Sequence, residues 1–190
     1  MWFFSVFVAC NTANIPLEDS GCTDCEDSSS PVDDTADPVG DDPPIEWAAL
    51  VINEFMAENR TTIAGDVGDY PDWIELYNPT SEMVSLDGWS MTDDLEDSDR
   101  VALDSSLEIP GGGFLLLWAS GDPGLGPKHL DFQLNVDGES IGLYRPDGVA
   151  TDRLTFAEQA ADFSAARVPD GEKNWAITAT ATPGSSNGGK

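Results

Sequence analysis

The sequence predicts an all-β protein of the β-sandwich class, preceded by a segment too polar and too charged to fold. Short apolar runs recur from residue 48 onward, and turn-forming residues such as Asp-Gly pairs bound almost every run. Only residues 157–161 favour a helix, of a turn or two. Short strands spaced by such turns are typical of sandwiches and barrels rather than of α/β folds.

About ten short strands are expected in this region. The first run is rich in Val and Ile, and in the second the letters DWIELYN alternate between two faces, which is the period of a half-buried strand. The run GFLLLWA is nearly all apolar, so it is expected to be a central strand covered on both sides. The predicted strands cover residues 48–55, 72–78, 83–86, 89–92, 100–103, 113–119, 132–134, 140–144, 149–156 and 174–178.

Large apolar side chains on these strands are the candidates for the core. Fully burying one of them contributes about 1.5 to 3 kcal/mol, and an exposed ligand-stacking role is the alternative. The predicted core aromatic residues are Trp73, Trp89, Phe114 and Trp118, and the inward faces also include Ile74, Leu76, Leu116, Leu143 and Phe156. Gly111 to Gly113 predict a tight turn or bulge, because no helix follows them as a phosphate-binding loop requires.

Charge divides the chain into two parts. The 190 residues contain 36 Asp and Glu against 8 Lys and Arg, a formal net charge of −28, which argues against nucleic acid or anionic lipid as a partner. Residues 1–47 hold 11 of the acids and no base, which leaves 25 acids and 8 bases, a net of −17, for the rest. Residues 11–47 are therefore predicted to be a disordered Asp/Ser/Pro-rich linker, and residues 48–188 the folded domain.

The first ten residues are interpreted as a lipoprotein-type signal. Residues 1–9 are apolar apart from Ser5, and Phe7 to Cys10 resemble a lipobox, where a bacterial signal peptidase cleaves before a Cys that receives diacylglycerol. Phe7 stands where Leu is usual and no Lys or Arg precedes the short apolar run, which indicates either a minimal signal or a start upstream of Met1. A frayed hydrophobic end is the alternative.

The anchor and the spacer together predict a location. A lipidated Cys10 followed by a charged, Pro-rich tether resembles the surface lipoproteins of Gram-negative bacteria, so the protein is expected at the cell envelope, on the outer membrane or the cell surface. An acidic tail of an intracellular protein is the alternative. Cys22 and Cys25 form one CxxC pair, which is expected to close a local disulfide in an oxidising compartment. Redox or zinc roles are disfavoured, because a βαβ context and two further ligands are missing.

Acidic loops make calcium a candidate ligand. Asp66, Asp69 and Asp72 recur every third residue in GDVGDYPDW, and the glycines between them let the chain fold back, so that three carboxylates could meet one Ca2+. A second acidic cluster follows in the next long loop, at Asp93, Asp94, Glu96, Asp97 and Asp99. Neither cluster has the spacing of an EF-hand, and solvated acidic loops are the alternative.

No catalytic constellation emerges from the sequence. The single histidine, His129, is expected in a surface loop, with Ser120 and Asp131 near it in the chain but without a nucleophile elbow around the serine. An acid pair for glycoside hydrolysis requires a geometry that residue counts do not supply. The chain is therefore predicted not to be an enzyme.

Several segments, taken together and in order, are similar to those of bacterial lamin tail domains. They are VINEFMAEN, GDYPDWIELYNPT, VSLDGWSMTDD, IPGGGFLLLWASG, FQLNVDGESIGLYRPDG and a closing part with ARVPDG, Trp175 and TPGSSNGG, and they span nearly all of residues 48–188. The resemblance implies an immunoglobulin-like β-sandwich that serves as an attachment or interaction module, often in secreted or membrane-associated proteins.

The favoured hypothesis is a non-enzymatic cell-envelope lipoprotein that displays this sandwich to a protein or glycan partner and binds no nucleic acid. The alternative is a Ca2+-dependent adhesion or carbohydrate-binding domain that holds the metal at Asp66, Asp69 and Asp72. Apart from this candidate Ca2+, no cofactor is expected.

Overall fold

The computed structural model describes residues 49–96 and 100–188. The predictions for the signal segment, for Cys10, for the linker and for the Cys22–Cys25 disulfide lie outside these residues, as do Asp97 and Asp99 of the second acidic cluster. Among the described residues, no helix is long and apolar enough to cross a membrane.

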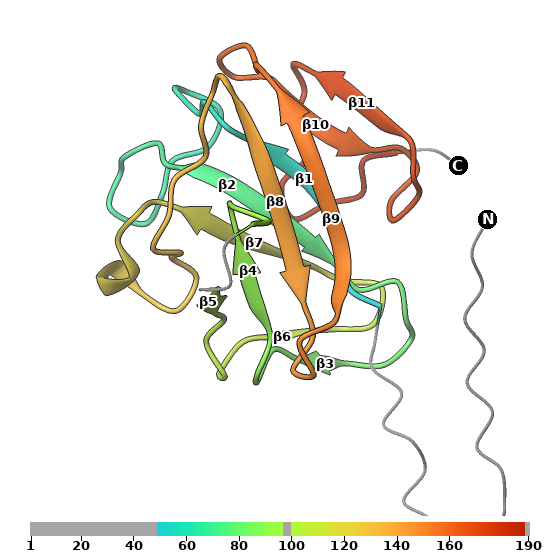
Figure 1. Ribbon diagram of the computed structural model, residues 1–190. Helices are drawn as coiled ribbons and strands as arrows, with labels where there is room; N and C mark the ends of the chain where they lie inside the picture. Colours follow the sequence, from blue (N-terminus) through green and yellow to red (C-terminus); the bar gives the residue numbers. More distant parts are fainter. Residues whose placement is uncertain (1–48, 97–99, 189–190) are drawn as a thin grey trace, which may run out of the picture. The chain divides into compact units, whose positions relative to one another are not determined.

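The described chain is an immunoglobulin-like β-sandwich, which confirms the predicted fold class (Figure 1). The first sheet has the order β11 (Trp175–Thr178), β10 (Ser164–Arg167), β1 (Val51–Met56), β2 (Asp72–Tyr77), β7 (Phe114–Ala119). The second has the order β5 (Val101–Ala102), β4 (Ser90–Thr92), β8 (Gly138–Tyr144), β9 (Ala150–Ala157). A short pair, β3 (Val84–Ser85) and β6 (Glu108–Ile109), and one 3-10 turn, η1 (Pro123–Leu125), complete the described elements. All the strand pairs are antiparallel.

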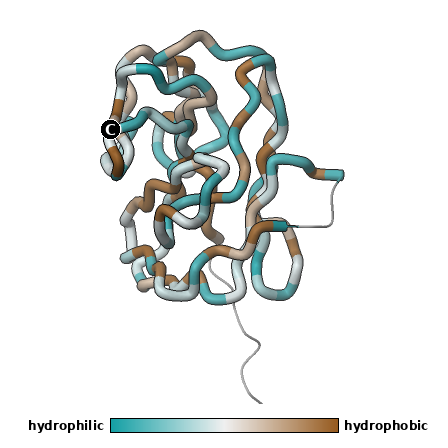
Figure 2. The backbone as a smooth tube through the Cα atoms, turned by 90° about the vertical axis from the view of Figure 1, so that its left-hand side faces the viewer, coloured by the Kyte–Doolittle hydropathy of each residue, from teal (hydrophilic) through white to brown (hydrophobic). Residues whose placement is uncertain are grey.

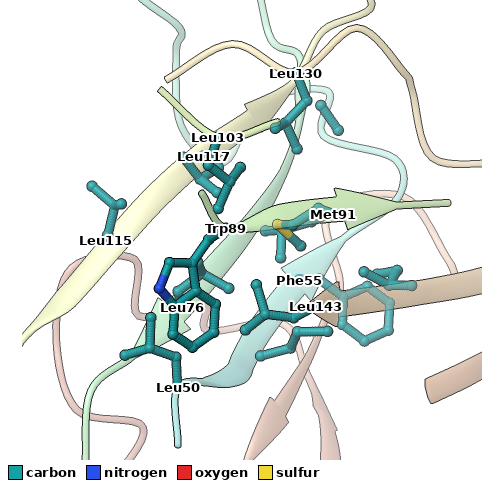
Figure 3. Packing of buried hydrophobic residues seen from close by; sticks show 14 of the residues in the cluster. Leu50, Phe55, Leu76, Trp89, Met91, Leu103, Leu115, Leu117, Leu130 and Leu143 are labelled. Atoms are coloured by element: carbon teal, nitrogen blue, oxygen red, sulfur yellow. The ribbon is translucent and has the colours of Figure 1, made fainter. Parts of the chain in front are cut away.

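The main core lies between the two sheets. Trp89 is 1% exposed and lies in this cluster, to which Leu76 of β2 and Met91 of β4 also belong (Figure 3). Along the backbone, apolar and hydrophilic residues alternate, the pattern that half-buried strands require (Figure 2). Trp89 and the inward residues Ile74, Leu76 and Leu143 therefore occupy the core in which they were expected.

A bulge in β1 determines which side chains face outward. The register between β1 and β2 shifts between Ile52 and Glu54, so one extra residue, Asn53, is inserted there. Ile52 belongs to the main core, whereas Glu54 pairs with Glu75 on the opposite face of the sheet. Without the bulge, the two-residue period of a strand would place Ile52 and Glu54 on the same face.

A second apolar cluster covers the outer face of the five-stranded sheet. It consists of Met56, Trp73 and Trp118, and Trp73 and Trp118 are directly opposed cross-strand partners in β2 and β7. Both tryptophans are buried, but in this outer cluster and not on the inward faces where they were predicted. Phe114, on the same face of β7, is half-buried and stacks on Tyr77 with ring centroids 4.9 Å apart. Because the run GFLLLWA is apolar on both sides of the strand, its sequence does not show which side chains face the main core and which face the outer cluster.

β7 is the last strand in its sheet, whereas the sequence predicted a central strand. The prediction of cover on both sides is correct, since Leu117 lies in the main core and Trp118 in the outer cluster. A loop also covers part of the free edge. The Trp118 N–H donates to the Lys128 carbonyl, and the Leu130 N–H donates to the Trp118 carbonyl. An apolar run can therefore lie at the edge of the sheet, because residues distant in the chain cover both of its faces and part of its free edge.

The remaining differences concern short elements. Residues 132–134 form no strand, and residues 157–161 form no helix. Two strands were missed, β6 and β10. β10 has the sequence SAAR, in which no residue is β-branched or aromatic, yet all four residues are buried between β1 and β11. Tertiary packing therefore overrides the weak strand propensity of this segment.

Candidate functional site

An apolar groove lies between the edge strands of the two sheets. Its volume is about 350 Å³, and the residues that line it come mainly from β9 and β11. Phe55 packs against both sides, with ring centroids 4.8 Å from Phe156 of β9 and 5.6 Å from Trp175 of β11. Ile177 of β11 also lines the groove and is 66% exposed. The groove is therefore an accessible apolar surface.

Both strands beside the groove have a free edge. Among the described residues, β9 pairs only with β8, and β11 pairs only with β10. β9 is also the longest of the described strands, with eight residues. A strand edge presents unpaired N–H and C=O groups to any segment that can lie along it. The groove therefore offers both apolar contacts and backbone hydrogen bonds.

A buried amide group lines the same groove. Gln159 is 6% exposed, and its Oε1 accepts a hydrogen bond from the Ala57 N–H at 2.8 Å. Its Nε2 has no hydrogen-bond partner in the described part of the chain. An unpaired buried donor costs about 1–3 kcal/mol, so a carbonyl oxygen that reached it would be bound favourably.

An ion pair joins β9 of the second sheet to β10 of the first. Asp152 of β9 accepts hydrogen bonds from Arg167 of β10, at 3.0 and 2.8 Å, and from the Ile52 N–H, at 2.9 Å. The Arg167 guanidinium also lies over the Trp175 ring, 4.6 Å from its centroid. Arg167 therefore links β9, β1 and β11, which fixes the walls of the groove relative to each other.

Two fully buried carboxylates lie on the outer face of the five-stranded sheet. Glu54 and Glu75 are directly opposed in β1 and β2, and both are 0% exposed. Burial raises the pKa of this pair of carboxyl groups above the ordinary value, because desolvation disfavours the charged form. Among the described residues, no Lys or Arg pairs with either of them. Neither residue was predicted from the sequence, because Glu54 reaches this face only through the bulge in β1.

The structure does not gather the predicted calcium ligands into one site. Asp66 faces His129, Asp69 Oδ1 lies against Gly65, and Asp72 lies in β2 and accepts the Asn59 N–H at 3.3 Å. The described residues contain no group of three or more His, Cys, Asp or Glu that could hold a metal ion. The loop does fold back, since the Gly65 N–H donates to the Asp69 carbonyl, but its carboxylates diverge.

The expectation for His129 is wrong, because its side chain is buried and not at the surface. Its Nδ1 lies 3.0 Å from Ser120 Oγ and its Nε2 lies 3.4 Å from Asp66 Oδ2. Although these are the residue types of a catalytic triad, Ser120 Oγ also accepts the Asp122 N–H, and the adjacent cavity of about 290 Å³ is lined by neither His129 nor Ser120. The geometry indicates a structural tie that fastens a loop to β7.

The fold defines the protein as an immunoglobulin-like β-sandwich module. The lamin tail domain family matches residues 46–158, more than half of the chain, and the protein belongs to this family. The match confirms the resemblance for the segments up to residue 158, and the family's domain is immunoglobulin-like and non-catalytic. β10, β11 and the residues after them lie beyond the matched range. No curated protein matches the chain.

Proposed function

We propose that this protein is a non-enzymatic lipoprotein of the cell envelope that displays its lamin tail domain on an acidic tether and binds an extended segment of a partner protein. The lipid is attached at Cys10, and residues 11–47 keep the sandwich away from the membrane. The partner binds along the groove between β9 and β11. The observation that carries the proposal is the unpaired Gln159 Nε2, which is buried beside an apolar groove flanked by two free strand edges.

An extended segment fits this combination of features. Such a segment adds to a sheet edge through its backbone, while alternate side chains enter pockets beside the edge. The eight residues of β9 supply the edge, and the groove beside Phe156 and Trp175 supplies the apolar pocket. Gln159 Nε2 is closed off from solvent in the free protein, so its side chain turns toward the groove when a backbone carbonyl of the segment accepts a hydrogen bond from it. A glycan is less suited to this surface, because most of the residues that line the groove are apolar.

The charge of the domain indicates the chemistry of the partner. Residues 48–190 carry 25 acids and 8 bases, and an excess of one sign steers partners of the opposite sign and repels those of the same sign. The favoured partner is therefore a segment in which apolar residues, facing the groove, alternate with basic residues, facing the solvent.

Titration of the full chain carrying Cys10→Ser with a seven-residue peptide of alternating valine and lysine tests this proposal. We expect NMR shift changes concentrated on β9, β11 and Gln159. Ile177→Asp and Gln159→Glu should weaken binding at least about tenfold, a loss of about 1.4 kcal/mol. Gln159→Glu is the sharper variant, because it removes the donor while adding a charge that attracts lysine.

Two controls separate groove binding from attraction by charge. Val149→Asp changes an exposed residue outside the groove, 52% exposed, and should leave the affinity unchanged. A peptide of alternating serine and lysine has the same charge and should not bind. Equal binding of both peptides, or shifts spread over the acidic surface, would rule out the groove as the binding site.

A further inference from the structure

The last described residues cover the outer face of the five-stranded sheet. We call residues 181–188 the C-terminal strap. Ala181 packs against the outer cluster that contains Trp73, and the Gly184 N–H donates to Glu75 at 2.5 Å. Thr182 donates to Glu54 through its backbone N–H, at 3.1 and 3.2 Å. The strap therefore seals the two buried carboxylates from solvent.

Hydrogen-bond directions at Asn187 are fixed by its surroundings. Its Nδ2 lies 3.2 Å from the Asn53 carbonyl and 3.0 Å from the Arg167 carbonyl, and both of these oxygens only accept. The amide oxygen Oδ1 must therefore face Thr182 Oγ1, which lies 2.5 Å away. Because Oδ1 also only accepts, the single hydrogen of the Thr182 hydroxyl is used in this bond.

This assignment leaves Glu54 with a proton. Its Oε2 lies 3.0 Å from Thr182 Oγ1, whose hydrogen already belongs to Asn187. The contact is a hydrogen bond only if Glu54 is the donor, which requires the neutral acid. The Ser164 hydroxyl, 2.6 Å from Glu54 Oε1, and the Thr182 N–H occupy the acceptor positions of the carboxyl group.

Glu75 requires the opposite state. Its Oε1 accepts from Asn53 Nδ2 at 3.1 Å, and its Oε2 accepts from the Gly184 N–H. The Asn53 amide cannot be reversed, because its Oδ1 accepts the Gly171 N–H and its Nδ2 also donates to Asp170. Glu75 is thus surrounded by donors and fits as the carboxylate. The pair holds one proton, on Glu54.

We propose that the proton on Glu54 holds the strap closed, so that the strap is a pH-sensitive latch over the outer face of the sheet. Losing the proton removes the donor to Thr182 and places two negative charges on directly opposed residues. Asp170 also acts on both carboxyl groups and adds to the repulsion, and the strap itself contains no ionisable side chain.

Opening the latch would uncover an apolar surface. Met56, Trp73 and Trp118 lie beneath this region, and Ala181 of the strap packs against them. Trp73 Nε1 is buried without a hydrogen-bond partner in the described residues. A buried donor without a partner lowers the stability of the closed state. Because closing takes up a proton, acidic conditions favour the closed state and alkaline conditions the open one. This inference concerns a different face from the groove and does not depend on the proposed partner.

Hydrogen exchange of the full chain, followed by mass spectrometry between pH 5.5 and pH 8.5, tests the latch. Exchange in a peptide that covers the strap is corrected for the intrinsic rate at each pH. We expect the protection of the strap to fall at least about tenfold as the pH rises across this range. If closing takes up one proton, protection can change by at most about tenfold per pH unit. Glu54→Gln should keep the strap protected throughout, because its amide donates to Thr182 as the neutral acid does.

A second variant and an internal reference make the test decisive. Thr182→Val removes the hydroxyl that receives the Glu54 proton, so protection should be lower at pH 5.5 and should change less with pH than in the wild type, because only the repulsion between Glu54 and Glu75 remains. Peptides from β8 report in each variant whether the sandwich is folded. The proposal is overturned if protection of the strap in the wild type does not change with pH. It is also overturned if protection changes with pH in Glu54→Gln as much as in the wild type. If Glu54→Gln does not fold, the same comparison is made with Thr182→Val.

Discussion

Arg167 of β10 and Asp152 of β9 form a largely buried ion pair that joins the two sheets. Their side chains are 9% and 11% exposed, and the guanidinium Nη2 lies 2.8 Å from Asp152 Oδ2. Arg167 also donates from Nε to the Ile52 carbonyl at 2.7 Å. The pair therefore determines the spacing between strands that come from different sheets.

Removing one member of this pair should be strongly destabilising. Asp152→Ala leaves the Arg167 charge buried without its carboxylate, and we expect the free energy of unfolding to fall by about 3–5 kcal/mol. Asp147→Ala is the matched control, because it breaks the more exposed pair with Arg145 and should change the free energy of unfolding far less. Urea unfolding measures both, and similar losses in the two variants would contradict this account.

Trp89 and Trp118 test the distinction between the two apolar clusters. Trp89 lies in the main core between the sheets, so Trp89→Ala should cost about 3–5 kcal/mol. Trp118→Ala affects the outer cluster and should cost less, because a peripheral site can relax around the cavity. Thermal unfolding followed by circular dichroism compares them. A melting temperature unchanged by Trp89→Ala would place this residue outside the core.

Stability should rise as the pH falls from about 8 to about 5, because the folded state then binds more protons than the unfolded chain. Burial raises the pKa of Asp72 to about 6 and also raises the pKa of the Glu54–Glu75 pair, so the neutral form of Asp72 and the one proton of the pair favour folding at the lower pH. Ionisation removes that contribution as the pH rises through each folded-state pKa. The melting temperature measured across this range checks the sign.

Asp72→Asn isolates one contribution to this pH dependence. The melting temperature of the variant should change less with pH than that of the wild type, since the half-buried group no longer titrates. Asp131→Asn removes the same charge at an exposed position and should leave the slope close to that of the wild type. Equal slopes in Asp72→Asn and Asp131→Asn would mean that general charge repulsion, not Asp72, causes the effect.

Membrane attachment is expected to depend on Cys10. Changing Cys10 to Ser should move the protein from the membrane fraction to the soluble fraction, because no acyl chain can be attached. Cys22→Ser is the control, since its thiol belongs to the predicted disulfide and not to the lipobox. Fractionation with labelled fatty acid provides the measurement, and unchanged partitioning of Cys10→Ser would refute lipidation.

The sequence alone determined the fold class and most strands of the sandwich. Alternation in β2 and glycine-containing turns are local signals, so they survive without knowledge of contacts. The family is also visible in the sequence, because its segments recur in order along the chain. The weak strand β10 was missed because Ser and Ala carry little strand propensity, although packing buries them.

Contacts between residues that lie far apart in the chain became visible only in the folded structure. The groove joins Phe55 to Trp175, and the strap joins Glu54 to Thr182, each across more than a hundred residues. A single bulge places Glu54 on the outer face, and a one-residue change of register reverses the face of each side chain. Composition and periodicity contain no information on such registers, because they arise from cross-strand pairing rather than from local preference.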